Sequence, residues 1–360
     1  MVFTLFRRAA TRFHTPGSRF YGTPPGAQHS IYISKSTNPY FNLTFEDWLF
    51  RHKNPEEPLL LIYRDDPCVI IGRNQNPWKE VNFEALRARP HIPFVRRRSG
   101  GGTVYHDMGN TNFSIHLPRH SFDRHITAQI VLRAVRSFGI DARVNDRNDI
   151  CVGEEKISSA YKIVNKRAYH HGTMLISSRL DTLGDLLRTN KDTMITKGVA
   201  SVRSPVCNLQ QFSPTIVHEL FVDAVVSEFQ KEYSINAPVV HIEETDQMKN
   251  IEYIRRGLDE LPSWNWAYGQ TPEFTYTIEN PFSWGDVTAE IRSKHGLVIA
   301  CNFQLINTLN NTIPESLSVL GRSLEGKRYG SFEESFVREA DIGPMQEVAI
   351  WIQRMTQTRP

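Results

Sequence analysis

Three arginines, Arg96 to Arg98, are followed by Ser99 and then by three glycines, Gly100 to Gly102, and the segment continues to Asp107 as a polar and β-prone stretch. Arginine guanidinium groups neutralise phosphate, and glycines let the backbone approach a ligand closely. Exposed N–H groups in such a turn can form an anion-binding nest. No Gly-Lys-Ser/Thr follows, so this is not a Walker loop. A flexible hairpin beside a basic patch would explain either feature alone. Together they predict a site for a nucleotide or pyrophosphate.

A second group of polar residues follows: Asn148–Ile150, Lys156–Lys162 and His170–Thr173. A lysine that reaches inward from a strand could pair with the carboxylate of an acyl substrate and with the phosphate of an acyl-nucleotide. We therefore predict that Lys156 is catalytic. An isolated lysine is more often a surface charge, and a histidine pair more often packs than binds metal. The neighbouring residues favour the functional interpretation.

The four cysteines, Cys68, Cys151, Cys207 and Cys301, are scattered, with neither a CxxC pair nor zinc-site spacing. We expect a reducing compartment and no structural metal. Cys151 is a candidate nucleophile, but a lone cysteine near a strand more often serves packing.

Hydrophobic periodicity predicts the elements that must position these residues. Two short apolar strands, 59–63 and 68–71, flank a turn that contains Pro67 and two aspartates, which predicts a hairpin. The remaining pattern indicates an α+β fold with a mixed, mostly antiparallel sheet. The other predicted strands are 31–34, 94–96, 102–105, 112–115, 156–163 and 169–176, and the predicted helices are 42–50, 128–138 and 216–232.

A length of 360 residues favours two domains. The stretch 243–246 is polar and lies in a segment without clear periodicity, after which strand-like alternation resumes at 274–278, 287–291 and 297–303. We predict a first domain over 28–240, a linker over 241–261 and a small α+β domain over 262–345.

The first 45 residues contain no acidic residue, while Arg7, Arg8, Arg12 and Arg19 alternate with apolar residues. That composition predicts a mitochondrial transit peptide over 1–27 and a location in the matrix. A basic tail without a targeting role is the alternative.

The net charge of +3 comes without a dense basic block, so nucleic acid is not an expected partner. The longest apolar runs fall far short of the roughly 20 residues that a membrane helix requires. We expect no membrane span.

Six motifs occur in an order similar to that of the lipoate-protein ligase A and mitochondrial lipoyltransferase family, which the chain resembles along nearly its whole length after the tail. A further stretch, Ser263–Pro272, looks like the start of that family's C-terminal accessory domain. The resemblance implies a biotin/lipoate ligase-like catalytic domain with a small accessory domain. The motifs are Ser36–Leu43, Ile71–Trp78, Arg97–Asp107, Lys156–Lys162, His170–Leu175 and Thr196–Ser204.

The resemblance also implies a two-step reaction in one site. Lipoate and ATP give lipoyl-AMP and pyrophosphate, and a lysine of an apo lipoyl domain then attacks the mixed anhydride. The expected acceptors are the E2 proteins of 2-oxoacid dehydrogenases and the glycine cleavage H protein. A Mg²⁺ ion is expected to neutralise charge in the first step, and the protein is expected to be a monomer.

Carried over by motif, two sets of residues would form this site. The set for ATP and the adenylate is Arg97, Gly102, Thr103, Val104, Tyr105 and Lys156. The set for lipoate is Lys156, Ser99, Gly72, Arg73, Asn74, His171, Gly172 and Thr173. Asp149 is the candidate ligand for the metal ion.

One departure from the family pattern lies beside Lys156. The family usually carries a glycine between the two serines that follow this lysine, whereas here Ser158 and Ser159 are adjacent. A one-residue deletion in a strand exchanges its two faces unless a bulge compensates. Alternatives therefore stay open: a transferase that uses a preformed lipoyl-nucleotide or an acyl thioester, or a non-enzymatic protein that binds lipoyl domains. A biotin ligase is disfavoured because its Gly-Arg-Gly-Arg loop is absent.

Overall fold

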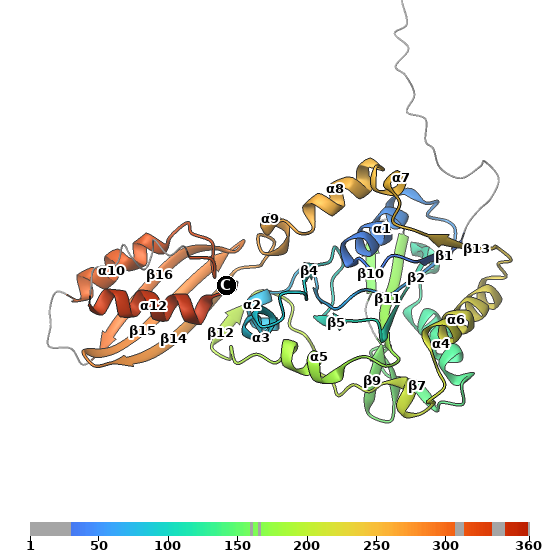
Figure 1. Cartoon of the computed structure of the whole chain (residues 1–360), viewed down its shortest axis with the longest axis horizontal. Helices are drawn as coiled ribbons and strands as arrows, with labels where there is room; N and C mark the ends of the chain where they lie inside the picture. The colour runs from blue at the N-terminus through green and yellow to red at the C-terminus, as the bar shows by residue number, and fades with distance from the viewer. Residues whose placement is uncertain (1–29, 159–160, 165–166, 307–312, 333–342, 359–360) are drawn as a thin grey trace, which may run out of the picture.

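The computed structural model describes residues 30–158, 161–164, 167–306, 313–332 and 343–358, with only the backbone described for 156–158 and 161–164 (Figure 1). The predicted targeting segment 1–27 lies outside these residues. A larger part of the molecule runs from β1 to β13, and a smaller part contains β14 to β16 with α10 and α12.

A six-stranded mixed sheet forms the centre of the larger part. Its first four strands pair antiparallel, and its last three pair parallel. This confirms the predicted mixed, mostly antiparallel sheet. The order is β10 (Tyr161–Val164), β11 (Arg167–Leu175), β6 (Asn110–Pro118), β2 (Leu59–Tyr63), β1 (Ile31–Ser34) and β13 (Val239–Ile242).

Helices cover both faces of this sheet, which is why β2 is apolar at every position. Leu60 and Ile62 pack in one cluster with apolar residues of α4 (Arg124–Arg136) and α6 (His218–Tyr233). The alternate residues of β2 pack in another cluster with α1 (Pro39–His52) and α8 (Glu252–Glu260). Figure 1 shows these two helix layers on opposite sides of the sheet.

Two three-stranded sheets carry the predicted site residues. In one, β3 (Cys68–Ile71) lies between β4 (Phe94–Arg96) and β5 (Val104–His106), so the glycine-rich segment becomes the loop from β4 to β5. The other contains β7 (Ala142–Val144), β8 (Ile150–Val152) and β9 (Glu155–Ser158). The other short elements of the larger part are α2 (Pro77–Glu80), α3 (Phe83–Arg87), α5 (Leu180–Leu187) and the 3₁₀ turns Arg119–Ser121 and Leu209–Gln211.

Two predictions about strand pairing were wrong. β2 and β3 do not form a hairpin, because β2 pairs with β1 and β6 whereas β3 pairs with β4 and β5. The turn between them is instead held by Asp65, whose buried carboxylate is a hydrogen-bond acceptor. The predicted strand 156–163 is two strands in different sheets, β9 and β10.

The smaller part is an antiparallel sheet with two helices on one face (Figure 1). β14 (Phe274–Phe282), β15 (Gly285–Lys294) and β16 (Leu297–Ile306) are consecutive neighbours, and α10 (Ile313–Leu324) and α12 (Pro344–Thr356) cover them. β12 (Met194–Thr196), which comes from the larger part, pairs with β14 as the edge strand. A shared apolar cluster therefore continues from one part into the other.

The segment predicted as a linker is mostly ordered structure. After β13 it forms α7 (Asp246–Lys249) and α8, and α9 (Trp264–Ala267) follows. A Cβ atom on Gly257 of α8 would lie 2.3 Å from Cγ2 of Thr44, so α8 packs closely on α1. The domain boundaries at 28–240, 241–261 and 262–345 stay predictions. Among the described residues, no helix has the length and apolar character needed to cross a membrane.

Candidate active site

The guanidinium group of Arg97 organises the glycine-rich loop from inside. Its Nη2 donates to the carbonyl oxygens of Gly100 at 2.6 Å and Gly102 at 2.8 Å, and Nε donates to Gly100 at 3.1 Å. Burial lowers the pKa of Arg97 to about 10, which leaves the group charged at neutral pH. Within the described residues, the N–H groups of Gly100, Gly101 and Gly102 have no acceptor. The loop can therefore offer several N–H donors to an anion.

The other two arginines of the triplet have structural partners rather than free guanidinium groups. Arg96 is fully buried and donates to the carbonyl oxygens of Arg73, Gln75 and Ala267 at 2.7 to 2.9 Å. Arg98 forms an ion pair with Glu260 at 2.5 Å. Arg96 therefore serves the fold, because backbone oxygens surround it.

Gly72 allows two loops to touch. A Cβ atom at this position would lie 2.1 Å from the carbonyl oxygen of Gly101, which is incompatible with the observed backbone. Next to this contact, Oε1 of Gln75 accepts from the Gly72 N–H and from Oγ1 of Thr103, both at 3.0 Å. Nε2 of Gln75 donates to Oγ of Ser201 at 3.0 Å. Gln75, which the sequence analysis did not single out, thereby links three segments of the site.

Two cavities meet beside this loop. The wider cavity, of about 400 Å³, includes Thr103, Tyr105 and the stretch 201–204 in its wall. The narrower one, of about 30 Å³, has room for one water molecule, so an acyl chain could enter only if its walls move. Val104 and Thr173 line both cavities, so the two cavities are neighbours. The walls of the narrow cavity are Leu43, Tyr63, Ile70, Arg97, Val104, His106, Asn112, His171, Gly172 and Thr173.

Three buried side chains, linked by hydrogen bonds, lie at one wall of the narrow cavity. Nε2 of His171 lies 3.1 Å from Oγ of Ser99, and Nδ1 lies 3.2 Å from Oε1 of Glu46. All three residues are buried. The glutamate orients the imidazole ring, and the ring fixes the serine at the start of the glycine loop. Glu46 was missed in the sequence, although a carboxylate inside the apolar run of a predicted helix was a usable signal.

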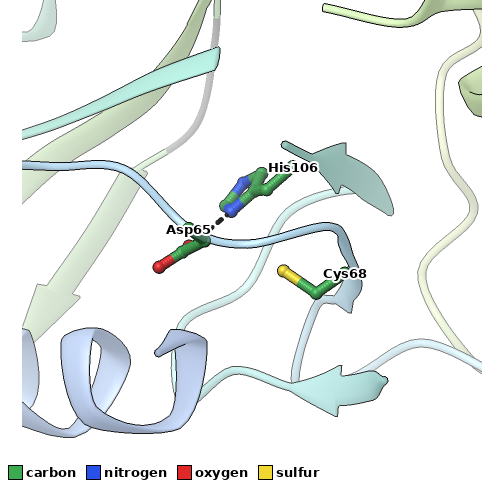
Figure 2. A group of neighbouring side chains, drawn as sticks. All are labelled: Asp65, Cys68 and His106. Carbon is green, nitrogen blue, oxygen red and sulfur yellow. Dashed lines mark hydrogen bonds and ion pairs between the residues drawn. The ribbon is translucent and has the colours of Figure 1, made fainter. Parts of the chain in front are cut away.

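Figure 2 shows a second buried imidazole, held by an aspartate. Nδ1 of His106 lies 2.8 Å from Oδ2 of Asp65, while Nε2 has no partner among the described residues. Ligand atoms of Asp65, His106 and Cys68 lie within 4.8 Å of one another. However, Asn42 and Asn112 also donate to the Asp65 carboxylate. Burial raises the pKa of the Cys68 thiol well above its usual value, which disfavours the thiolate that a metal needs.

Arg73, Asn74 and Asp149 are not among the residues that line the two cavities. The guanidinium of Arg73 stacks on Trp266 at 4.8 Å, and Asn74 is exposed, with its carbonyl accepting from the Val199 N–H. The Asp149 carboxylate is buried and lies 3.3 Å from Nη2 of Arg147. Lys156 lies on β9 opposite Cys151; its side chain is outside the described residues. The roles assigned to these residues stay predictions.

Comparison with known proteins identifies the class of enzyme. Residues 38–230, more than half of the chain, match the lipoyl protein ligase A/B catalytic domain family. A protein named lipoate-protein ligase A from Psychrobacter cryohalolentis is 37% identical over 79% of this chain and 87% of its own length. Another of that name, from Bdellovibrio bacteriovorus, is 34% identical over 83% and 88%. The chain therefore belongs to the lipoate-protein ligase family, and it is an enzyme of that class.

Solved structures agree with this assignment. LipL1 of P. falciparum, in complex with lipoate, aligns over 90% of this chain and 99% of its own with a TM-score of 0.59 and 25% identity. The bi-partite ligase of Thermoplasma acidophilum, studied with its E2 lipoyl domain, aligns over 66% and 96% with a TM-score of 0.56 and 25% identity. A lipoate-protein ligase A bound with ATP aligns over 66% and 98%, with a TM-score of 0.56, and its 24% identity supports the fold.

Proposed function

We propose that this protein activates free lipoate with ATP and transfers the lipoyl group to a lysine of an apo lipoyl domain. The observation that carries the proposal is the wall that the two cavities share at Val104 and Thr173. An acyl group in the narrow cavity and a nucleotide in the wide cavity would meet beside the glycine loop. There the unpaired N–H groups could bind the phosphate.

The chemistry has two steps in this arrangement. A lipoate carboxylate oxygen attacks the α-phosphorus of ATP, and pyrophosphate leaves with the bonding electrons. The amine of the acceptor lysine then attacks the carbonyl carbon of lipoyl-AMP, AMP leaves, and the new amide nitrogen loses a proton. By resemblance, Lys156 would stabilise negative charge on the phosphate and carboxylate in both steps. Arg97 supports the same anion indirectly, because it turns the Gly100 and Gly102 carbonyl oxygens away from it.

Mg²⁺ belongs to the proposal as the counter-ion of the ATP phosphates. Glu80 is the one carboxylate among the described residues that line the wide cavity. Asp149, the residue predicted from the sequence, lies beside Arg147 instead. We therefore expect the phosphate oxygens and water to supply most ligands of the ion.

The acceptors and the compartment are also proposals. The lipoyl domains of E2 proteins and the H protein are the expected substrates, and the family supports the first of these through the archaeal relative studied with its lipoyl domain. The acid-free, arginine-containing first 45 residues support import into the mitochondrial matrix. Fusion of residues 1–30 to a fluorescent protein tests this: cytosolic fluorescence would contradict it. Size-exclusion chromatography with light scattering tests the expected monomer.

A lipoylation assay separates the ligase from its closest alternative. The full chain is incubated with an apo lipoyl domain, ATP and Mg²⁺, together with either free lipoate or synthetic lipoyl-AMP, and the intact mass of the acceptor is recorded. We expect the lipoyl mass increase in both reactions, and its loss in the Lys156→Ala variant. An increase only with lipoyl-AMP would overturn ATP-dependent activation, and no increase in either reaction would overturn the enzyme activity itself.

The transferase alternative has one observation in its favour. In the β8–β9 pair, Cys151 faces Lys156 while Ile150 faces Ser158, so Ile157 is an extra residue on β9. Such a bulge changes the direction of the strand next to the lysine. The bulge lies immediately before the position where the family glycine is missing. If the local geometry no longer supports activation, transfer from preformed lipoyl-AMP would remain.

A further inference from the structure

A third cavity, of about 400 Å³, lies between the two parts of the molecule. One wall comes from the α2–α3 region and the loop 188–191, and the other comes from Tyr329 and the end of α12. Arg188 lines this cavity and also the wide cavity of the candidate active site. The two spaces are therefore neighbours, and this third cavity is called the interdomain cavity below.

Positive charge dominates the wall of the interdomain cavity. Four cationic residues, Arg87, Arg188, Lys191 and Arg354, line it, whereas Glu84 is the only carboxylate among its described lining residues. Within the described part of the chain, Arg188 and Arg354 have neither an ion-pair partner nor a hydrogen-bond acceptor. Among the described residues, the wall of this cavity therefore carries net positive charge, and two of its guanidinium groups have no partner.

Two groups in the wall are held in place by the protein yet retain unused donors. Nη1 of Arg87 donates to the carbonyl oxygen of Gln357 at 2.7 Å. Nζ of Lys191 donates to the Met355 carbonyl oxygen at 2.8 Å and to the Tyr276 hydroxyl at 3.1 Å. The remaining N–H groups of both side chains are available. Because these cations tie the larger part to α12 and β14, an anion bound here would contact both parts of the molecule.

The environment of Lys191 also favours a bound anion. Its ammonium lies in the same wall as Arg87, and its pKa is lowered by burial and then by the charge of Arg87. An anion between these cations would offset that repulsion.

We propose that the interdomain cavity is a second anion site that binds a diphosphate group through Arg354 and Arg188, beside Arg87 and Lys191. Adjacent phosphates suit this wall because several separated donors can each meet a different oxygen. The inference does not depend on the ligase activity, since binding can be measured directly. If the proposed function holds, the pyrophosphate released in the first step would find this site through Arg188, which lines both cavities.

Calorimetric titration of the full chain with inorganic pyrophosphate, without lipoate or acceptor, tests the proposal. The informative variant is Arg354→Glu, because Arg354 is exposed and lines only the interdomain cavity. We expect at least tenfold weaker binding. The matched control is Arg255→Glu, an exposed arginine of α8 that lines neither cavity, for which we expect less than a twofold change.

Titrations with ATP and AMP identify the source of the diphosphate. A loss of ATP affinity in Arg354→Glu that matches the loss for pyrophosphate would support a site that also accepts a nucleotide tail. An unchanged ATP affinity would support free pyrophosphate as the ligand. The proposal is overturned if the wild-type protein binds no pyrophosphate, if Arg354→Glu binds it as tightly as the wild type, if Arg255→Glu loses as much affinity as Arg354→Glu, or if AMP affinity falls equally.

Discussion

The loop around Arg96 and Arg97 and the wall of the interdomain cavity use arginine in opposite ways. Arg96 and Arg97 are buried, and protein carbonyl oxygens accept their hydrogen bonds. Arg188 and Arg354 are exposed and have no acceptor among the described residues. The first pair fixes the backbone that would hold a ligand, whereas the second is free to meet a ligand itself. The arginine-rich stretch in the sequence is therefore mainly a scaffold.

Removing Arg96 should have the largest effect on stability. Arg96→Met would leave buried carbonyl oxygens of residues 73, 75 and 267 without a donor. Loss of one side of a buried charged network typically costs ~3–5 kcal/mol. We expect a decrease of that size in the free energy of unfolding, measured by urea denaturation. A decrease below ~1 kcal/mol would contradict the scaffold role.

Disruption of the contact between Gly72 and Gly101 should have the next largest effect on the free energy of unfolding. Gly72→Ala would place a methyl group against the Gly101 carbonyl, so we expect a loss of about 3 kcal/mol in unfolding free energy. Displacement of the loop should also reduce lipoylation activity about 100-fold. Gly100→Ala is the matched control, because its Cβ would meet nothing within 4 Å. Equal effects of the two substitutions would contradict the close approach.

Low pH should decrease the free energy of unfolding because one buried imidazole resists protonation in the folded protein. Burial lowers the pKa of His170 to about 3, and its Nδ1 lies 2.9 Å from Oγ1 of Thr127. The folded protein keeps this ring neutral, while the unfolded chain gains a proton below about pH 6.5. The contribution of the neutral His170 ring to the free energy of unfolding is therefore fully present above about pH 6.5. It is lost progressively as the pH falls toward 3. Between pH 7.5 and 5, the loss should amount to about 2 kcal/mol.

Urea unfolding at a series of pH values measures this loss, and His170→Gln isolates it. The variant lacks the titrating ring, so its stability should fall less steeply over the same range. Parallel pH profiles of the variant and the wild type would contradict the assignment to His170.

Substitution of Arg354 in the wall of the interdomain cavity should have the smallest effect on stability. Arg354→Gln removes an exposed charge without a described partner, so the free energy of unfolding should change by less than about 0.5 kcal/mol. The same measurement on Arg96→Met provides the contrast. A large destabilisation by Arg354→Gln would mean that this arginine serves the scaffold too.

The sequence predicts the parts of the site that depend on composition and order along the chain. The glycine-rich loop, the His171–Thr173 strand and the α+β class follow from residue types and periodicity. The partners of Arg96 do not, because Arg73 and Ala267 are distant from it in the sequence and meet it only in the folded structure. Pairing between strands was also mispredicted, since a short turn such as Arg64–Pro67 can join neighbours in one sheet or lead into another.

The buried partners of the site were missed for a related reason. Glu46 and Gln75 carry no local signal of their function, which arises from contacts with His171 and with Thr103 and Ser201. A carboxylate in an apolar helical run shows that something unusual is buried, but it does not show what the carboxylate meets.

Lipoate-dependent exchange of labelled pyrophosphate into ATP tests the central claim most directly, because it reports activation of lipoate by this chain without any acceptor protein. We expect exchange that requires free lipoate and Mg²⁺ and is abolished in Lys156→Ala. Absence of exchange in the folded wild-type protein, with lipoyl transfer from synthetic lipoyl-AMP retained, would contradict the claim and leave a transferase.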